Sequence, residues 1–350
     1  MRIYQPSMWS FLPQPQTRSY ASIARISLPG GNSAGRASLN LIKPLIPMAT
    51  PLTPLSLQQV LAQTQLPALP SSAVAILQLA QTDDAGPAEF AKPIEADIGL
   101  LGQVLRFVNS SYFGFSREIT SVQQAISLVG IRPIQNFALW SAVFSLVPSP
   151  KFGSFDLKHL WQDSLRRGFF SRELGQCLKL SNSEELFVAS LLQDIAIPIL
   201  LKAIPEIYEP LITERASCGR RLSDLEMERL GWNHAQAAAA LCRNWNLPES
   251  FANLVELHPN VDALLSGSDP RLDAACVAVA SMLPSCSSDE WSEQHAFFKS
   301  LRQLIKATPV DFAALFHRVD QTTEDFAPLL KLPAPRRRLN DWLIAAARTA

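Results

Sequence analysis

The chain of 350 residues has no excess of either charge, because Lys and Arg together number 31 and Asp and Glu together also number 31. A balanced charge gives no overall positive field that would favour nucleic acid. The one dense basic run, Arg336-Arg337-Arg338, is more typical of the solvated start of a helix than of a binding patch. We therefore expect no nucleic-acid partner.

Cysteine is sparse and shows no ligand spacing. The five cysteines contain no C-x-x-C pair and are odd in number, which argues against a zinc cluster and against a disulfide framework. We interpret them as reduced core thiols of a cytoplasmic protein. They are Cys177, Cys218, Cys242, Cys276 and Cys286.

A long apolar run is also missing. The longest apolar segment without charge, residues 133–150, contains Gln135, Asn136 and three prolines. A membrane-spanning helix needs about 20 consecutive, predominantly apolar residues. We therefore predict no transmembrane helix, no membrane partner and a cytoplasmic location.

The first part of the chain lacks acidic residues, since none occurs before Asp83. It is rich in Ser and Pro and shows no sustained periodicity. We therefore predict that residues 1–54 are a disordered extension. The alternative is that translation truly starts at Met48. The composition also resembles a mitochondrial transit peptide, which stays an alternative.

Alternation of apolar and polar residues with period two is absent over any useful length, so no sheet is predicted. Apolar residues instead recur with helical spacing, as in Leu101, Val104, Leu105 and Val108. The clearest helix covers residues 122–129, because Ser121 and Gln124 form a capping-box pattern before it and Gly130 follows it. The fold class predicted is all-α with many short helices. Further helices are expected near residues 70–80, 136–147, 158–178, 184–203, 222–230, 234–245, 249–257, 271–283, 292–306, 309–319 and 338–348.

Common catalytic motifs are missing as well. The chain has no G-x-x-x-x-G-K-[ST], G-x-G-x-x-G or H-E-x-x-H sequence. Residues 30–35 are rich in glycine, but they follow no credible strand and include no lysine. We interpret them as a linker.

Two sequence blocks carry a family resemblance. One is Leu66-Pro67-Ala68-Leu69-Pro70, and the other runs from Asp97 through Leu105-Arg106-Phe107-Val108-Asn109-Ser110-Ser111-Tyr112-Phe113-Gly114. Together they resemble the HDOD domain, an all-helical output module of bacterial signalling proteins. The resemblance covers about residues 60–283 and implies a multi-helical, HD-like bundle in two packed lobes.

The resemblance also implies a domain organisation. We expect an HDOD domain over residues 55–283, with an N-terminal helical lobe at 55–150 and an HD-like lobe at 151–283. Residues 284–350 are expected to form a helical extension.

Several signature residues are candidates for interaction. Asn109 ends an apolar helix, where a polar amide predicts a capping or lobe-bridging hydrogen bond. Tyr112 and Phe113 fit either partner-facing anchors or, more commonly, packed aromatics. Trp161, Glu226 and Trp245 complete this set.

The HD-like lobe resembles a metal-binding site that has lost its ligands. Relatives in the superfamily carry a His-Asp pair where this chain has Gln193-Asp194. The resemblance also implies that Asp163 and Pro259 replace histidines and that Ser281 replaces an aspartate. Three candidate ligand residues remain, Asp194, His234 and His258. Asp194 also fits a structural acid on a buried helix, and His234 fits the first turn of a helix after Asn233.

Two functions follow from this pattern. The preferred one is a non-enzymatic regulatory module without cofactors, which relays signals by docking signalling proteins in the groove between its two lobes. The alternative is a residual metal- or nucleotide-binding sensor, or a cryptic phosphohydrolase, that uses Asp163, Asp194, His234 and His258. A guanine or cyclic nucleotide is the candidate ligand in the second case.

Overall fold

The computed structural model describes residues 56–64, 68–79, 85–110, 113–153, 155–266, 270–306, 308 and 310–349. These residues form helices and no strand, apart from one isolated antiparallel bridge between Phe152 and Phe155. The predicted all-α class is therefore confirmed. In chain order the helices are α1 (Leu57–Gln63), α2 (Ser71–Leu79), α3 (Pro87–Glu95), α4 (Ile98–Val108), α5 (Val122–Val129), α6 (Ile131–Leu146), α7 (Leu157–Cys177), α8 (Ser183–Leu192), α9 (Ala196–Ala203), α10 (Pro205–Cys218), α11 (Leu222–Leu230), α12 (His234–Asn244), α13 (Glu249–Leu257), α14 (Val261–Leu265), α15 (Leu272–Ser281), α16 (Gln294–Leu304), α17 (Phe312–Phe326), the 3-10 helix η2 (Pro328–Leu330) and α18 (Leu339–Thr349).

The ends of α5 lie where the sequence places them. The side chain of Ser121 accepts a hydrogen bond from the backbone N–H of Gln124 at 3.2 Å, so Ser121 caps the helix as predicted, but the reciprocal bond of the predicted capping box is not formed. Gly130 ends the helix with a φ of 98°, a conformation that glycine adopts without strain. The next helix, α6, starts at Ile131 directly after this glycine, so one residue separates two helices.

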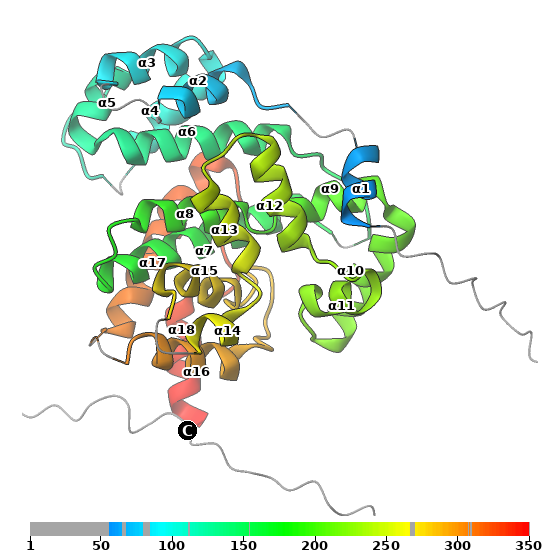
Figure 1. Cartoon of the computed structure of the whole chain (residues 1–350). Helices are drawn as coiled ribbons and strands as arrows, with labels where there is room; N and C mark the ends of the chain where they lie inside the picture. The colour runs from blue at the N-terminus through cyan, green and yellow to red at the C-terminus, as the bar shows by residue number, and fades with distance from the viewer. Residues whose placement is uncertain are drawn as a thin grey trace, which may run out of the picture.

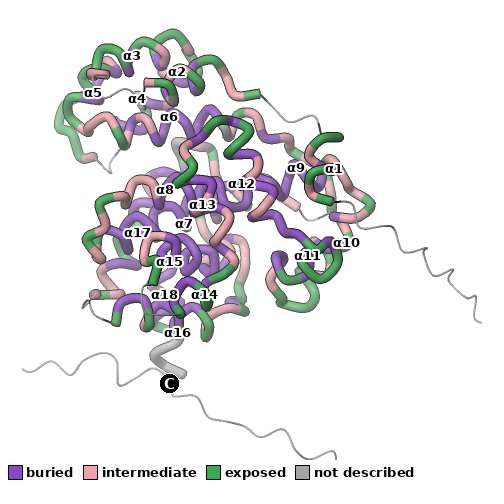
Figure 2. The backbone as a smooth tube through the Cα atoms, viewed as in Figure 1, coloured by how far each residue is buried: buried purple, intermediate pink, exposed green. Residues whose placement is uncertain are grey.

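Two lobes of helices pack on each other, as Figure 1 shows. The N-terminal lobe contains α2 to α6, and α6 lies along the second lobe, where it contacts α8. The second lobe is built around α7, α8 and α15, which pack against one another. Figure 2 shows these central helices as almost entirely buried.

The C-terminal helices are part of the same packed body. The ring of Phe326, at the end of α17, lies 5.3 Å from the ring of Phe107 in the N-terminal lobe and 5.0 Å from Phe169 on α7. The buried guanidinium of Arg166 donates hydrogen bonds to the backbone oxygens of Pro284 and Arg337. Residues 284–350 therefore contact both lobes.

The cysteines are free thiols, and three of them, Cys242, Cys276 and Cys286, are buried as expected. The prediction of a core position is wrong for Cys218, which is exposed at the end of α10. Cys177 is half-buried. The last turn of a surface helix faces solvent, so an apolar residue type there does not imply burial.

The basic run at residues 336–338 precedes α18, and each arginine has a partner. Arg336 pairs with Asp289 at 3.0 Å, Arg338 pairs with Glu324 at 2.6 Å, and Arg337 lies 3.8 Å above the ring of Trp342. These contacts attach α18 to the rest of the fold.

One helical stretch of the described residues, Ser183–Ala203, is long and apolar enough to span a membrane by length and composition. Its apolar window is 89% buried inside the protein. This stretch consists of α8, the turn after it and α9, which lie at the centre of the second lobe. Burial against the neighbouring helices therefore explains its apolar composition.

The predicted disordered extension at residues 1–54 and the candidate residue Tyr112 lie outside the described residues.

Candidate functional site: a closed Asp-His-His cluster

Asp194 lies in the turn between α8 and α9, at the centre of the second lobe. The backbone of this turn is held by hydrogen bonds from Ile195 N to Leu192 O at 3.1 Å and from Ile197 N to Asp194 O at 3.0 Å. Apolar residues surround the turn on both helices, so the carboxylate is only 6% exposed. A buried carboxylate needs charged or hydrogen-bonding partners, and Asp194 has several.

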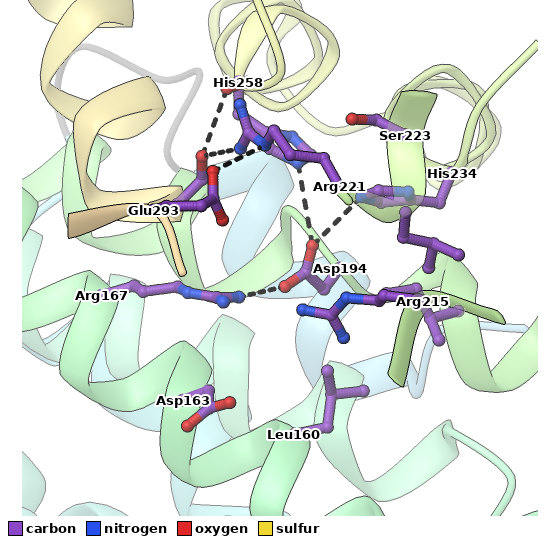
Figure 3. A pocket seen from close by; sticks show the side chains of 13 residues that line it. Leu160, Asp163, Arg167, Asp194, Arg215, Arg221, Ser223, His234, His258 and Glu293 are labelled. Carbon is purple, nitrogen blue, oxygen red and sulfur yellow. Dashed lines mark hydrogen bonds and ion pairs between the residues drawn. The ribbon is translucent and has the colours of Figure 1, made fainter. Parts of the chain in front are cut away.

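His234 reaches the site because α12 begins at this residue. Asn233 and Gln236 form a full capping box, with reciprocal bonds of 3.0 Å and 3.1 Å, which fixes the first turn. Nε2 of His234 lies 3.3 Å from Oδ1 of Asp194. Figure 3 shows the imidazole pointing at this carboxylate.

Glu226 on α11 orients His234 from the other side. Its Oε2 lies 2.6 Å from Nδ1 of His234 and accepts a hydrogen bond from the backbone N–H of His234 at 2.9 Å. The hydroxyl of buried Tyr208 donates to the other oxygen, Oε1. The signature residue Glu226 is therefore a fully buried positioning group and does not face solvent.

His258, at the end of α13, completes the cluster. Its Nδ1 lies 2.7 Å from the backbone oxygen of Val255, and its Nε2 lies 3.7 Å from Oδ1 of Asp194. Because a carbonyl oxygen can only accept, Nδ1 carries the proton and Nε2 presents a lone pair toward the carboxylate. The ligand atoms of Asp194, His234 and His258 all lie within 4.8 Å of one another.

Arg167 on α7 occupies the remaining side of Asp194. Its Nη1 donates to Oδ2 of Asp194 in a buried ion pair, as Figure 3 shows. Asp194 therefore has a fixed cation on one oxygen and two imidazoles on the other. Sequence reasoning missed Arg167, although an arginine inside the apolar stretch between Leu165 and Phe170 is a signal that could have found it.

The charges of the cluster balance internally. Burial acts to raise the pKa of Asp194, but the charge of Arg167 and the hydrogen bond with His234 outweigh it and hold the pKa well below the ordinary value. Burial acts to lower the pKa of His234, but Glu226 and Asp194 outweigh it and raise the pKa to about 9. Burial and the charge of His234 lower the pKa of His258 to about 3. At neutral pH two carboxylates, one guanidinium and one imidazolium thus face one another.

Arg221 forms hydrogen bonds with two further residues that the resemblance assigns to the degenerate metal site. Its guanidinium donates to the backbone oxygen of Pro259 at 3.1 Å and to Oγ of Ser281 at 2.6 Å, and it pairs with Glu293 at 3.1 Å. Pro259 and Ser281 therefore take part in an arginine-centred network that joins α11, α13, α15 and the C-terminal segment. Arg221 and Glu293 were not foreseen from the sequence.

Asp163 and Gln193 lie apart from the cluster. Asp163, one turn before Arg167 on α7, accepts a hydrogen bond from the backbone N–H of Cys286 at 2.6 Å and lines the same pocket (Figure 3). Gln193 is fully buried but does not line that pocket. Within the described part of the chain its amide has no hydrogen-bond partner. The position that the resemblance matches to a metal-binding histidine therefore does not line the pocket above Asp194.

The pocket above the cluster is small, with a volume of about 70 Å³. It opens into a wider cleft of about 430 Å³ between α7, α10 and residues 282–293. Asp163, Arg167, Arg215, Arg221 and Glu293 line both spaces. The cleft mixes arginines with acidic side chains, so it favours neither charge strongly.

The other signature residues are structural. Asn109 ends α4, where its Nδ2 donates to the backbone oxygens of Leu105 and Ile119 and its Oδ1 accepts from Ile119 N at 2.7 Å. The capping prediction for Asn109 is confirmed, and its bonds stay within the N-terminal lobe. Phe113 is half-buried with its ring 5.1 Å from Phe107. Trp161 and Trp245 are buried.

Comparison with known proteins now places the chain in a family. The family model of the HDOD domain matches residues 66–261, and the chain belongs to this family. A curated relative, an uncharacterized protein of Treponema pallidum (strain Nichols), is 28% identical over 204 residues. That match covers 56% of this chain and 38% of the relative, so the chain spans well under half of the relative's length.

Solved structures share the fold. An HDOD domain protein of unknown function from Geobacter sulfurreducens has a TM-score of 0.61 at 19% identity, over 78% of this chain and 95% of the other. A protein of Shewanella amazonensis SB2B that carries the name of a phosphohydrolase has a TM-score of 0.60 at 20% identity, over 78% and 97%. A Marinobacter aquaeolei VT8 protein named for signal transduction has a TM-score of 0.52 at 18% identity, over 81% and 59%.

Proposed function

We propose that this HDOD protein is a non-enzymatic regulatory module that acts in the cytoplasm by docking signalling proteins. The observation that carries the proposal is the ion pair between Arg167 and Asp194. A hydrolytic metal site needs several ligands and an open position for water. Here a permanent cation of the protein already holds the carboxylate of Asp194, and Gln193 does not line the pocket above it.

The wide cleft beside the cluster supports docking as the way of acting. Clefts between packed elements favour binding, and this one is bounded by the exposed residues Arg215 and Arg220 on one side. The C-terminal segment forms the opposite wall with Ser288, Glu290 and Trp291. A partner that enters the cleft would contact both the HD-like lobe and the C-terminal helices.

The proposal is tested by affinity capture with the full chain as bait. A partner should be enriched by the wild type and by a control variant, Lys299→Glu on α16, and lost with Arg215→Glu in the cleft. The matched control changes charge by the same amount at an exposed position outside the cleft. Partners held equally by all three baits would contradict docking in this cleft.

A second candidate, a metal-binding sensor, has one observation in its favour. Oδ1 of Asp194 lies 3.3 Å and 3.7 Å from the Nε2 atoms of His234 and His258. Donors about 2.1 Å from a tetrahedral metal lie about 3.4 Å from one another, so these two distances fit. Glu226 holds Nδ1 of His234 in the manner of the carboxylates that orient metal-binding histidines.

The raised pKa of His234, to about 9, weighs against this candidate, because a metal would have to displace its proton at neutral pH. Elemental analysis of the purified chain and cobalt absorption spectra separate the two functions. Stoichiometric metal in the wild type would favour the sensor. If the Arg167→Met variant binds metal and the wild type does not, Arg167 is the group that closes the site. That result would favour the non-enzymatic docking module.

A further inference from the structure

A second cavity, unconnected with Asp194, lies where the N-terminal lobe meets α7 and the C-terminal helices. Its volume is about 340 Å³, within the range of small-molecule sites. It shares no lining residue with the pocket above the Asp-His-His cluster. The lining comes from α4, α6, α7 and the residues around the end of η2, and consists of Gln103, Arg106, Trp140, Ser141, Phe144, Ser145, Trp161, Leu330, Lys331 and Leu332.

The charge of this cavity is one-sided. Arg106 and Lys331 line it, and none of its lining residues is acidic. Neither cation forms an ion pair with another residue of the described ranges. Two unpaired cations on one cavity wall favour an anion, because an incoming negative charge meets no repulsion.

Aromatic rings form another wall. The ring centroid of Phe144 lies 4.3 Å from that of Trp140 and 3.7 Å from that of Trp161. Trp140 and Trp161 are buried, so the half-buried ring of Phe144 offers the surface on which a nucleobase or another aromatic ring can stack. This wall therefore favours a planar ligand.

The indole of Trp140 supplies a third feature. Trp140 is 2% exposed, and within the described part of the chain its Nε1–H has no hydrogen-bond acceptor. A buried donor without an acceptor destabilises the folded state, so such groups in folded proteins usually have a partner. Because Nε1 has almost no accessible surface, a ligand oxygen or nitrogen in the adjoining cavity accepts this bond only when the indole shifts toward it.

The backbone holds Lys331 in an unusual conformation beside the cavity. Its φ is 54°, in the left-handed region, and the turn is fixed by bonds from Lys331 N to Pro328 O at 3.1 Å and from Leu332 N to Ala327 O at 2.8 Å. Glycine adopts this conformation at lower cost than lysine. Replacing Lys331 with glycine therefore removes the charge without weakening the turn.

We infer that this cavity binds a mononucleotide, with its base on the aromatic wall and its phosphate between Arg106 and Lys331. A guanidinium can hold two phosphate oxygens at once, and the ammonium of lysine adds a point charge. The inference does not depend on the docking role proposed above, because it concerns different residues.

The test is isothermal titration of the full chain with GMP, AMP and cyclic GMP, supported by tryptophan fluorescence. Guanosine, adenosine and ribose 5-phosphate serve as probes that carry only the base or only the phosphate. At least one nucleotide should bind, and its fragments should bind at least tenfold more weakly. Equal affinity for ribose 5-phosphate would contradict a role of the aromatic wall.

Three variants locate the site. Arg106→Gln and Lys331→Gly should each weaken nucleotide binding at least tenfold, whereas Lys299→Gln on α16 should not change it.

Two results would overturn the inference. One is the absence of binding by every nucleotide at millimolar concentration. The other is binding that Arg106→Gln and Lys331→Gly, both shown to be folded by thermal melting, leave at wild-type strength. The second result, combined with a loss of binding in Asp194→Asn, would place the nucleotide at the Asp-His-His cluster.

Discussion

The ring centroids of His234 and His258 lie 5.2 Å apart, and both histidines direct Nε2 at the same oxygen of Asp194. Their other nitrogens face different groups, a carboxylate of Glu226 for His234 and the carbonyl of Val255 for His258. Two carboxylates around the imidazole of His234 favour its charged form, whereas burial and the positive charge of His234 lower the pKa of His258 and keep that ring neutral. The two histidines are therefore held in different protonation states, His234 charged and His258 neutral.

This difference gives the first prediction. At pH 7, ¹⁵N chemical shifts should show His234 as an imidazolium and His258 as a neutral ring with its proton on Nδ1. The expected pKa values are about 9 for His234 and about 3 for His258. Glu226→Gln, which removes one carboxylate from His234, should lower the pKa of that histidine. An uncharged His234 in the wild type at pH 7 would contradict the described charge balance.

The second prediction concerns stability at alkaline pH. The pKa of His234 rises from an ordinary 6.5 to about 9 on folding, so its contribution is fully present below pH 6.5 and is lost as the pH rises through about 9. The free energy of unfolding, measured by urea denaturation, should therefore fall between pH 7 and 9.5. His234→Gln should be less stable at pH 7 but should show a smaller fall over this range.

Lowering the pH should also reduce the free energy of unfolding, because Asp194 and His258 both act in this direction. The pKa of Asp194 is depressed on folding, so its contribution exists above its ordinary value and is lost as the pH falls through the folded value. The pKa of His258 is lowered to about 3, so below pH 6.5 the unfolded chain takes up a proton that the folded chain refuses. Maximum stability is expected near neutral pH.

The third prediction concerns the cap of α5. Ser121→Ala should lower the free energy of unfolding by about 1 kcal/mol, because the N–H of Gln124 loses its acceptor. Ser127→Ala in the same helix is the matched control. Ser127 bonds only to the carbonyl of Gln123 within the helix, and alanine favours helix, so this change should be neutral or slightly stabilising. Equal losses in both variants would rule out a specific effect of the cap.

The sequence was informative where local rules decide the structure. Apolar spacing and the Ser121 and Gly130 signals placed α5, and most other apolar blocks proved to be helices. It was uninformative where proline interrupted the pattern. Helices α3 and α10 were not foreseen, because Pro93 and Pro210 lie inside them and hid their periodicity.

The candidate site was predicted only in part, for a physical reason. Asp194, His234 and His258 follow from residue types that the family resemblance singles out, and they do meet. Arg221 could not be placed from the sequence, because its role depends on partners far away along the chain, such as Ser281 and Glu293. Long-range ion pairs leave no periodic signal.

The fourth prediction concerns the stability of the cluster. Asp194→Ala should lower the free energy of unfolding by roughly 3 kcal/mol, because Arg167 and charged His234 would stay buried without their shared carboxylate. Asp163→Ala on α7 is the control, since it removes only the acceptor of one backbone N–H and should cost about 1 kcal/mol. A loss at Asp194 no larger than that at Asp163 would mean that the ion pair contributes little.

The last prediction is that the chain hydrolyses no phosphodiester with iron, manganese or zinc, and that Gln193→His does not create this activity. Position 193 is buried and outside the pocket that Asp194 lines, so an imidazole there would not join Asp194, His234 and His258 in the observed fold. Arg167 would still hold one oxygen of Asp194, and Pro259 and Ser281 would still be bound to Arg221.

The measurement is turnover of bis-p-nitrophenyl phosphate and of cyclic dinucleotides by the wild type and Gln193→His. A double variant, Gln193→His with Arg167→Met, separates a missing ligand from a blocking cation. Turnover by the wild type that Asp194→Asn abolishes, while the variant keeps its thermal midpoint within a few degrees, would make the protein an enzyme and overturn the scaffold proposal.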